Sequence, residues 1–372
     1  MTGNAIPSVR IRPDIAAMDG YTFISGTYEV LADWLDRPAD SIIKLDTNEN
    51  LYGPSPKALA ALAALNRELA IYPDVECRHL RKLLSDYIGL DPAHILVGAG
   101  ADELIDLTLR LFLEPGDSII NCPPTFTMYP LVARWTGNCT VIEVPRLPDF
   151  SLDVETIEAA VVEHQPMLLF LCIPNNPDGG MVAPETLRRL LELPVTIVVD
   201  EAYIEFSASD GFTSWVPDTP NLIILRTLSK WAGLAGLRIG YGVYPLTIIQ
   251  HLWKIKHPFN VNVAADIAAR ATLEDLPAMQ AVVEKLIRER GRLGVELAKI
   301  SFLDPLPSQG NYLLCRVNGM STTDLKRRLD AEGILIRNYN KAGLHEYVRI
   351  SVGKPEHTDA LLAALRRIEV ER

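Results

Sequence analysis

The chain contains 372 residues with a formal net charge of −11, and 48% of its residues are hydrophobic and 22% charged. A chain of this length exceeds the size at which a single hydrophobic core stops growing, so we expect two domains. The acidic balance argues against a nucleic-acid or anionic-membrane surface, because both of these partners attract basic proteins.

Other features of the sequence favour a cytoplasmic protein without a bound metal. Five cysteines are scattered without a C-x-x-C pair, which is typical of buried thiols in a reducing compartment. Residues 1–14 lack the apolar stretch of a secretory signal, and no uncharged apolar run approaches the length of a membrane span. The seven histidines show neither H-x-x-H nor H-E-x-x-H spacing, so we expect no metal site.

Residues 1–40 show no core pattern, and we expect an N-terminal arm that packs elsewhere or on a partner subunit. From residue 41, short apolar runs alternate with amphipathic stretches such as 102–113 and 154–162. Continuous apolar runs predict strands covered on both faces, as in a mostly parallel sheet. We therefore expect an α/β three-layer sandwich over residues 41–258. The predicted strands are 42–45, 95–97, 118–121, 140–144, 167–172, 195–199, 221–225 and 238–243.

The pattern changes after residue 258. Residues 276–299 predict a long helix, and the later apolar runs 312–317, 334–337 and 347–351 predict strands with helices between and after them. We expect residues 259–372 to form a smaller α+β domain.

Asp200 and Glu201 directly follow the predicted buried strand 195–199. In open α/β sheets, ligands bind at the carboxyl ends of the strands. A lone aspartate at such a position more often caps the next helix. A carboxylate here would also suit a cofactor that carries a protonated ring nitrogen.

The next predicted strand ends in Thr227-Leu-Ser229-Lys230, and Arg238 follows eight residues after the lysine. A lysine in an apolar pocket has its charged form disfavoured, which makes its amine a better nucleophile. Two hydroxyl groups and an arginine suit a phosphate group. Taken separately, Lys230 fits a solvated loop lysine and Arg238 a salt-bridge partner, but together that interpretation needs several coincidences.

Two further turns follow predicted strands. Asn176 lies in a Pro/Asn/Gly-rich turn after strand 167–172, which places it at the same edge of the sheet as Asp200. Gly100 and Ala101 link a strand to a helix, which is a weak signal for a phosphate held by helix amides.

Together these motifs resemble the fold-type I aminotransferases that use pyridoxal phosphate, and within them the histidinol-phosphate aminotransferase family. The resemblance extends over nearly the whole chain, from residue 45 to residue 353. Its most specific stretch is 226–240, and the motifs at 200–206 and 122–129 support it.

The resemblance implies that Lys230 forms a Schiff base with pyridoxal phosphate and moves a proton between the substrate Cα and the cofactor C4′. It implies that Asp200 pairs with the ring nitrogen, so that the ring withdraws electrons. Tyr203 and Asn176 would hydrogen-bond the phenolic oxygen, and Phe126 would stack on the ring. The implied phosphate ligands are Ala101, Asp102, Thr227, Ser229 and Arg238, with Tyr72 from the other subunit of a homodimer.

The same resemblance implies substrate contacts from Arg349, Arg337 and Asn176, although each arginine also suits a surface salt bridge. The family's aromatic contact, a tyrosine before Pro-Gly, is replaced by Phe23 in Phe23-Ile-Ser-Gly26, so only Tyr21 is left to supply a hydroxyl. The usual Asn-Pro-Thr-Gly becomes Asn176-Pro-Asp178-Gly179, which adds a carboxylate near the cofactor.

The implied reaction transfers an amino group from L-histidinol phosphate to 2-oxoglutarate, giving imidazole-acetol phosphate and L-glutamate. The alternatives are an aromatic or broad-range amino-acid aminotransferase and a lyase like threonine-phosphate decarboxylase. A non-catalytic cofactor-binding module is a further alternative, but residues 1–40 contain no helix-turn-helix pattern and Lys230 is retained with all its partners.

Overall fold

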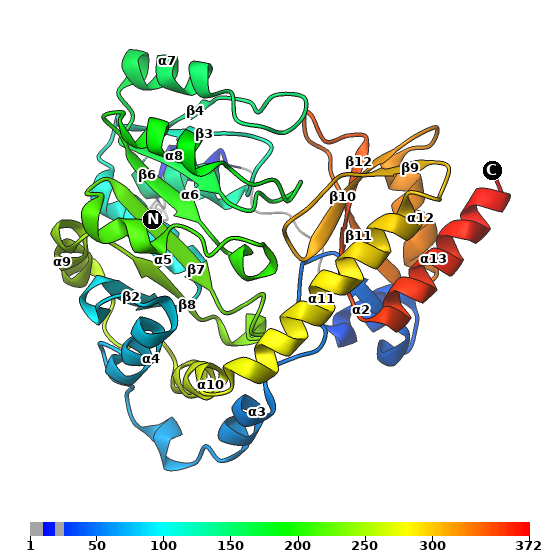
Figure 1. Ribbon diagram of the computed structural model, residues 1–372, viewed down its shortest axis with the longest axis horizontal. Helices are drawn as coiled ribbons and strands as arrows, with labels where there is room; N and C mark the ends of the chain where they lie inside the picture. The colour runs from blue at the N-terminus through cyan, green and yellow to red at the C-terminus, as the bar shows by residue number, and fades with distance from the viewer. Residues whose placement is uncertain (1–9, 19–25, 138) are drawn as a thin grey trace, which may run out of the picture.

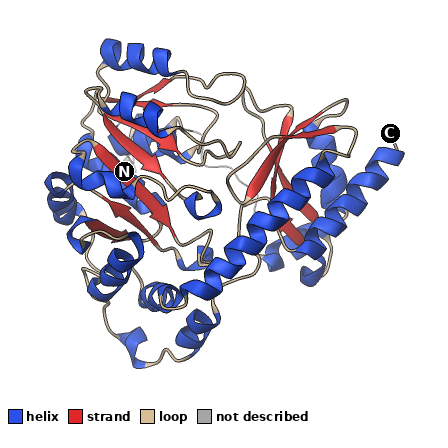
Figure 2. Ribbon diagram, in the orientation of Figure 1, coloured by secondary structure: helices blue, strands red, loops and turns tan. Residues whose placement is uncertain are grey.

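The computed structural model describes residues 10–18, 26–137 and 139–372, and the strands in these ranges form two sheets (Figures 1 and 2). The larger sheet has, in the described part of the chain, seven strands in the order β2-β8-β7-β6-β5-β3-β4. β8 runs antiparallel to both of its neighbours, and the other pairs are parallel. The strands are β2 (Ile95–Gly98), β3 (Ser118–Asn121), β4 (Thr140–Glu143), β5 (Leu168–Cys172), β6 (Thr196–Asp200), β7 (Leu222–Thr227) and β8 (Gly240–Val243).

Helices cover both faces of the larger sheet (Figure 1). Every residue of β5 and β7 is buried, which is why their sequences are continuous apolar runs and not alternating ones. The predicted α/β three-layer sandwich with a mostly parallel sheet is therefore confirmed. The helices of this unit are α3 (Pro56–Ala63), α4 (Arg78–Ile88), α5 (Ala101–Phe112), α6 (Met128–Gly137), α7 (Val154–His164), α8 (Pro184–Leu191), α9 (Leu246–Ile255) and α10 (Val263–Leu273).

The smaller sheet has the order β1-β11-β12-β10-β9, and β1 pairs with β11 in parallel while the other pairs are antiparallel. Its strands are β1 (Ile43–Leu45), β9 (Leu303–Pro305), β10 (Tyr312–Val317), β11 (Ile334–Asn338) and β12 (Tyr347–Ser351). The remaining helices are α1 (Pro13–Ala16), α2 (Tyr28–Leu35), α11 (Leu276–Leu297), α12 (Thr322–Ala331) and α13 (Pro355–Val370).

Strand β1 lies in a different unit from the one we expected. We assigned residues 41–258 to the larger domain, but β1 belongs to the smaller sheet, where Ile43 pairs with Ile334. A three-residue strand carries no local signal of its partner, because the pairing is set by a segment nearly 300 residues away. The bounds 1–40, 41–258 and 259–372 stay a proposal, and the chain enters the larger unit only after β1.

Part of the expected N-terminal arm packs on its own chain. Leu31 of α2 is buried against Ile42 and Leu335, next to the smaller sheet. Thr27 caps this helix, since its hydroxyl oxygen accepts a hydrogen bond from the Val30 amide at 3.5 Å.

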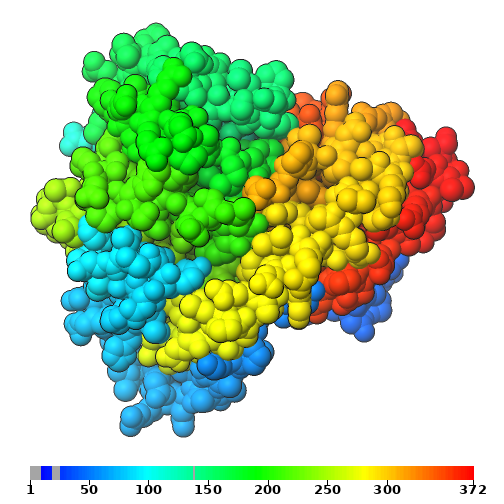
Figure 3. All heavy atoms as spheres, viewed as in Figure 1, coloured from blue at the N-terminus to red at the C-terminus, as the bar shows by residue number. Residues whose placement is uncertain are grey.

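α11 runs diagonally from beside α10 of the larger unit across the smaller unit (Figures 1 and 3). Arg290 of this helix donates to the Phe206 carbonyl at 3.0 Å, beyond β6, and to the Gly310 carbonyl at 2.7 Å, next to β10. Across the described ranges, no helix combines the length and apolar character needed to span a membrane.

Candidate active site

Asp200 ends β6 at the carboxyl edge of the larger sheet and is buried. Its Oδ2 accepts a hydrogen bond from the Tyr129 hydroxyl at 2.7 Å, and its Oδ1 accepts one from the Ala202 amide at 3.0 Å. Burial raises the pKa of Asp200 to about 6, although both hydrogen bonds favour the ionised form and oppose this rise. The carboxylate is therefore held in a fixed orientation and is mostly ionised at neutral pH.

Lys230 follows β7 and is partly buried. Its Nζ donates to the Thr47 carbonyl at 2.9 Å and lies 6.0 Å from the centre of the Tyr203 ring. In the described part of the chain, no carboxylate lies within ion-pair distance of this ammonium. Burial, followed by the positive charge of Arg349, lowers the pKa of Lys230 to about 8. Near neutral pH, Lys230 therefore has a larger neutral fraction than a solvated lysine has.

The Tyr203 hydroxyl is the meeting point of two asparagine amides. It accepts from Asn48 Nδ2 at 3.1 Å and from Asn176 Nδ2 at 3.4 Å. Burial raises the pKa of Tyr203, so the hydroxyl keeps its proton and can donate it to a ligand oxygen. The structure thus brings Tyr203 and Asn176 together, as the sequence predicted.

The predicted phosphate site lies at the N-terminus of α5. Arg238 forms an ion pair with Asp102 at 2.8 Å and donates to Ser229 Oγ at 3.4 Å, while Thr227 Oγ1 donates to Ser229 Oγ at 2.9 Å. No side chain caps α5, so its first amides, from Ala101 onward, stay available for an anion.

Gly100 shows that these residues fit a phosphate group. The glycine has φ +85°, and a Cβ at this position would lie 2.6 Å from Arg238 Nη2. A larger residue would therefore displace the Arg238 guanidinium from its place beside the helix N-terminus. Uncapped amides, two hydroxyl groups and a guanidinium that glycine allows to approach the helix N-terminus are suitable for a phosphate monoester.

Arg349 and Arg337 lie on adjacent strands of the smaller sheet. Arg349 is buried, and its Nη1 donates to Asn176 Oδ1 at 2.6 Å while its Nη2 donates to the Asp46 carbonyl at 2.6 Å. In the described residues its Nε is buried without a hydrogen-bond acceptor. A buried guanidinium with an unused donor is suited to an anionic ligand.

The other predicted residues are placed differently. Phe126 is partly buried and packs edge-on against Tyr129, with ring centres 5.5 Å apart. Tyr72 is 78% exposed and stacks on Phe259, with ring centres 4.5 Å apart, so it lies at the surface of the chain. Phe23 and Tyr21 lie outside the described residues.

The Asp178 carboxylate forms hydrogen bonds within its own turn. Its side chain is buried, with Oδ1 accepting from the Asn175 side chain and Oδ2 from the Gly180 amide at 2.7 Å. The aspartate therefore closes its own turn, because the turn offers an amide two residues ahead. Burial raises the pKa of Asp178.

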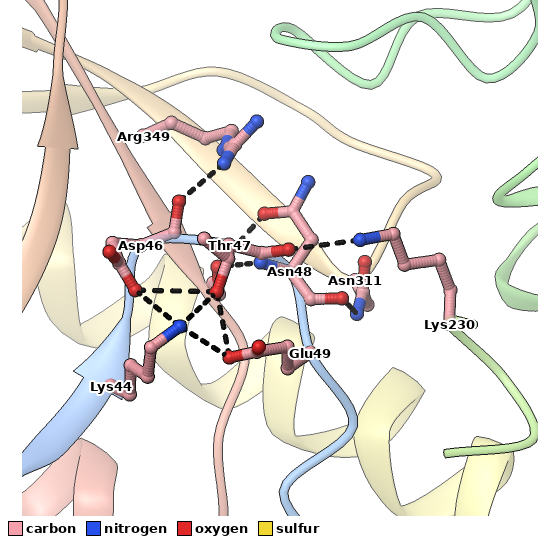
Figure 4. A network of polar contacts seen from close by, with 9 residues as sticks. Lys44, Asp46, Thr47, Asn48, Glu49, Lys230, Asn311 and Arg349 are labelled. Atoms are coloured by element: carbon pink, nitrogen blue, oxygen red, sulfur yellow. Dashed lines mark hydrogen bonds and ion pairs between the residues drawn. The ribbon is translucent and has the colours of Figure 1, made fainter. Parts of the chain in front are cut away.

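The sequence did not assign roles to Asn48 and Tyr129, which the structure adds to the site. Both lie in stretches that carried the family resemblance, but Asn48 follows a three-residue strand of the smaller sheet and Tyr129 lies eight residues after β3. A segment from residue 46 to 49 lies between Lys230 and Arg349, which reach it from different sides (Figure 4). In the described ranges, no cluster of three or more His, Cys, Asp or Glu side chains could hold a metal ion.

Comparison with known proteins gives a consistent picture. Residues 40–365 match the family model of aminotransferase class I and II. The chain is 50% identical over 368 residues to a chloroplastic histidinol-phosphate aminotransferase of Nicotiana tabacum, covering 98% of this chain and 87% of the relative. It is 48% identical to a histidinol-phosphate aminotransferase of Roseiflexus castenholzii, with 96% and 98% covered. The crystal structure of a histidinol-phosphate aminotransferase from Sinorhizobium meliloti in complex with pyridoxal 5'-phosphate matches with a TM-score of 0.89 at 30% identity, covering 97% of this chain and 98% of that one.

Proposed function

We propose that this chain, which belongs to the aminotransferase class I and II family, transfers the amino group of L-histidinol phosphate to 2-oxoglutarate. The products would be imidazole-acetol phosphate and L-glutamate, a step of histidine biosynthesis. The chain is a pyridoxal-phosphate-dependent aminotransferase, and the proposal concerns its substrates and the residues that act on them.

When bound, pyridoxal phosphate supplies an aldehyde that takes up amines and a ring that withdraws electrons from the substrate Cα. Ala101, Asp102, Thr227, Ser229 and Arg238 would hold its phosphate group, and Phe126 would cover one face of its ring. Asp200, oriented by Tyr129, would hold a proton on the ring nitrogen. Tyr203 and Asn176 would hydrogen-bond the phenolic oxygen.

The observation that carries the proposal is the state of Lys230. Its ammonium contacts a backbone carbonyl and the face of Tyr203, and the lowered pKa leaves a fraction of the amine neutral near pH 7. A neutral amine can attach the cofactor covalently and later accept the proton from the Cα of the amino donor. A solvated lysine of ordinary pKa would do neither efficiently.

The two arginines support a substrate that carries an anionic group. Arg349 would bind this group through its free Nε, and Arg337, beside it on β11, would supply a second basic contact. L-histidinol phosphate carries a phosphate group and 2-oxoglutarate carries two carboxylates, and both substrates would bind to Arg349 and Arg337 in turn. Binding of both substrates by the same two arginines fits a reaction in which the substrates alternate in one site.

We also propose a homodimer in which Tyr72 contributes to the cofactor phosphate of the partner subunit. Tyr72 belongs to a group of exposed apolar residues that stack on it or are close to it in sequence, and a monomer rarely leaves such a group uncovered. These are Leu69, Ile71, Val75 and Phe259. A cytoplasmic location stays part of the proposal and is supported by five free, buried cysteines.

A half-reaction screen tests the substrate assignment. The cofactor-loaded enzyme is mixed with histidinol phosphate, phenylalanine, tyrosine and threonine phosphate, and conversion to the amino form of the cofactor is followed by absorbance. Histidinol phosphate should react with the highest kcat/KM. A strong preference for unphosphorylated aromatic donors would contradict the proposal.

A further inference from the structure

Lys44 of β1 forms a compact charged network with Asp46, Thr47 and Glu49 (Figure 4). Its side chain is 5% exposed, and its Nζ donates to Thr47 Oγ1 at 2.7 Å and to Glu49 Oε2 at 2.8 Å. Asp46 Oδ1 lies 3.6 Å away, and the Thr47 hydroxyl donates to Glu49 Oε2 at 2.7 Å. Every group in this network lies between residues 44 and 49, so the network fixes the shape of one turn.

That turn connects the two sheets through Asn48. The Asn48 amide and Oδ1 both bond Ser351 Oγ at 2.8 Å, and its carbonyl accepts from Asn311 Nδ2 at 3.0 Å, on the side of the smaller sheet. On the side of the larger sheet, Asn48 Nδ2 donates to the Tyr203 hydroxyl.

Backbone groups of the same turn contact both cationic residues of the site. The Asp46 carbonyl accepts from Arg349, and the Thr47 carbonyl accepts from Lys230. Asn48 itself has φ +55°, in the left-handed region, which asparagine adopts more readily than most residues with a side chain. The contacts of Asp46, Thr47 and Asn48 therefore all depend on the conformation of one turn.

We propose that Lys44 is a positioning residue of the active site, which locks the 46–49 turn so that Asn48 stays on the Tyr203 hydroxyl. The inference rests on the proposed function, because Tyr203 matters here through its contact with the cofactor. Glu49 is the ion-pair partner of Lys44 in this restraint. Burial opposes its ionisation, but hydrogen bonds from Lys44 and Thr47 outweigh burial and lower the pKa of Glu49.

Asn48 would act by strengthening the hydrogen bond from Tyr203. A hydroxyl that accepts a hydrogen bond becomes a better donor, since neighbouring hydrogen bonds polarise one another. A stronger bond to the phenolic oxygen lowers the proton affinity of the lysine-bound cofactor, so releasing the turn should raise the pH at which its absorption band changes.

Two substitutions of opposite charge separate positioning from electrostatics. Lys44→Met removes a positive charge and Glu49→Gln removes a negative one, but both release the turn. Positioning predicts that both raise the midpoint of the absorption change, by about half to one pH unit for one lost hydrogen bond. If only charge mattered, Lys44→Met would raise the midpoint and Glu49→Gln would lower it, which would overturn the proposal.

Asn48→Ala tests the same contact with Tyr203 without a change of charge. It should raise the midpoint alone, and adding Glu49→Gln or Lys44→Met to it should add little, because all three act on one contact. Additive shifts would contradict the proposal. If Lys44→Met does not fold, the cycle of Glu49→Gln with Asn48→Ala answers the same question.

The matched control is Lys82→Met. Lys82 also pairs with a nearby carboxylate, Asp86, but it is exposed on α4 and far from the turn in sequence. Lys82→Met should leave the midpoint of the absorption change where it is in the wild type, and a shift as large as that of Lys44→Met would overturn the proposal. A wild-type enzyme without the lysine-bound band would instead refute the proposed function, so the two failures are distinguishable.

Discussion

Arg337 and Arg349 lie directly opposite each other on the antiparallel strands β11 and β12. Opposite residues in such a pair project from the same face of a sheet, so the two guanidinium groups belong to one cationic surface. Two positive charges on one face repel each other, and we propose that this face binds the anionic group of the substrate.

Substituting each arginine should therefore affect a different set of substrates. Arg349→Gln should raise KM about 10- to 100-fold for every donor and for 2-oxoglutarate, because a charge-assisted hydrogen bond is lost. Arg337→Gln should impair histidinol phosphate while sparing phenylalanine. Steady-state kinetics with each substrate checks this, and equal losses with both donors for Arg337→Gln would refute the role of Arg337.

Tyr129→Phe should move the acidic limb of the pH profile. The Tyr129 hydroxyl favours the ionised form of Asp200, whose pKa burial raises to about 6. Without this bond the pKa rises further, by about one to two units. Activity that requires the carboxylate is then lost at a higher pH, as kcat/KM between pH 5 and 8 would show. An unchanged limb would mean that Asp200 ionisation does not limit the reaction.

Attachment of the cofactor should follow the titration of Lys230. Burial lowers the pKa of this amine to about 8, and only the neutral form attacks an aldehyde. The second-order rate of cofactor addition to the stripped enzyme should rise about tenfold per pH unit below 8 and level off above it. Stopped-flow absorbance measures this rate, and a midpoint near the ordinary lysine value of about 10.4 would contradict the burial of the amine.

Mixed dimers test the proposed contribution of Tyr72 to the partner. Tyr72→Phe should weaken cofactor affinity, and Lys230→Ala should abolish covalent attachment. In a heterodimer of the two, one site combines Lys230 from one subunit with Tyr72 from the other. Mixing should restore wild-type affinity in that site, as a fluorescence titration would show. No recovery on mixing would indicate that Tyr72 acts in its own subunit or not at all.

Asp178→Thr should leave donor preference unchanged. The aspartate bonds the Asn175 side chain and the Gly180 amide within its own turn, and a threonine hydroxyl can replace one of these bonds. We expect kcat/KM for histidinol phosphate within about threefold of the wild type and a small change in Tm. A large change in the ratio between phosphorylated and unphosphorylated donors would contradict a purely local role.

The larger sheet could be predicted closely because most of its strands are buried on both faces, and their sequences are therefore continuous apolar runs. β8 begins at Gly240 and not at residue 238, because Arg238 adopts φ +54° and cannot extend the strand. β1 and β9 have three residues each, and their pairing depends on distant segments, so the sequence did not reveal their place.

The same distinction between local signals and distant contacts applies to the residues of the site. Asp200, Lys230 and Asn176 follow apolar strands, and the rule that ligands bind at strand ends locates them. Asn48 reaches Tyr203 across 155 positions, and Tyr129 reaches Asp200 across 71. Contacts of this separation leave no periodic signal in the sequence, so only the folded chain identifies them.

The most direct test of the central claim is to reduce the cofactor-loaded enzyme with borohydride and map the modified peptide by mass spectrometry. The account predicts one pyridoxyl group per chain, on Lys230, with loss of both the label and the visible absorption band in Lys230→Ala. A label on another lysine, or a band that persists in Lys230→Ala, would contradict it.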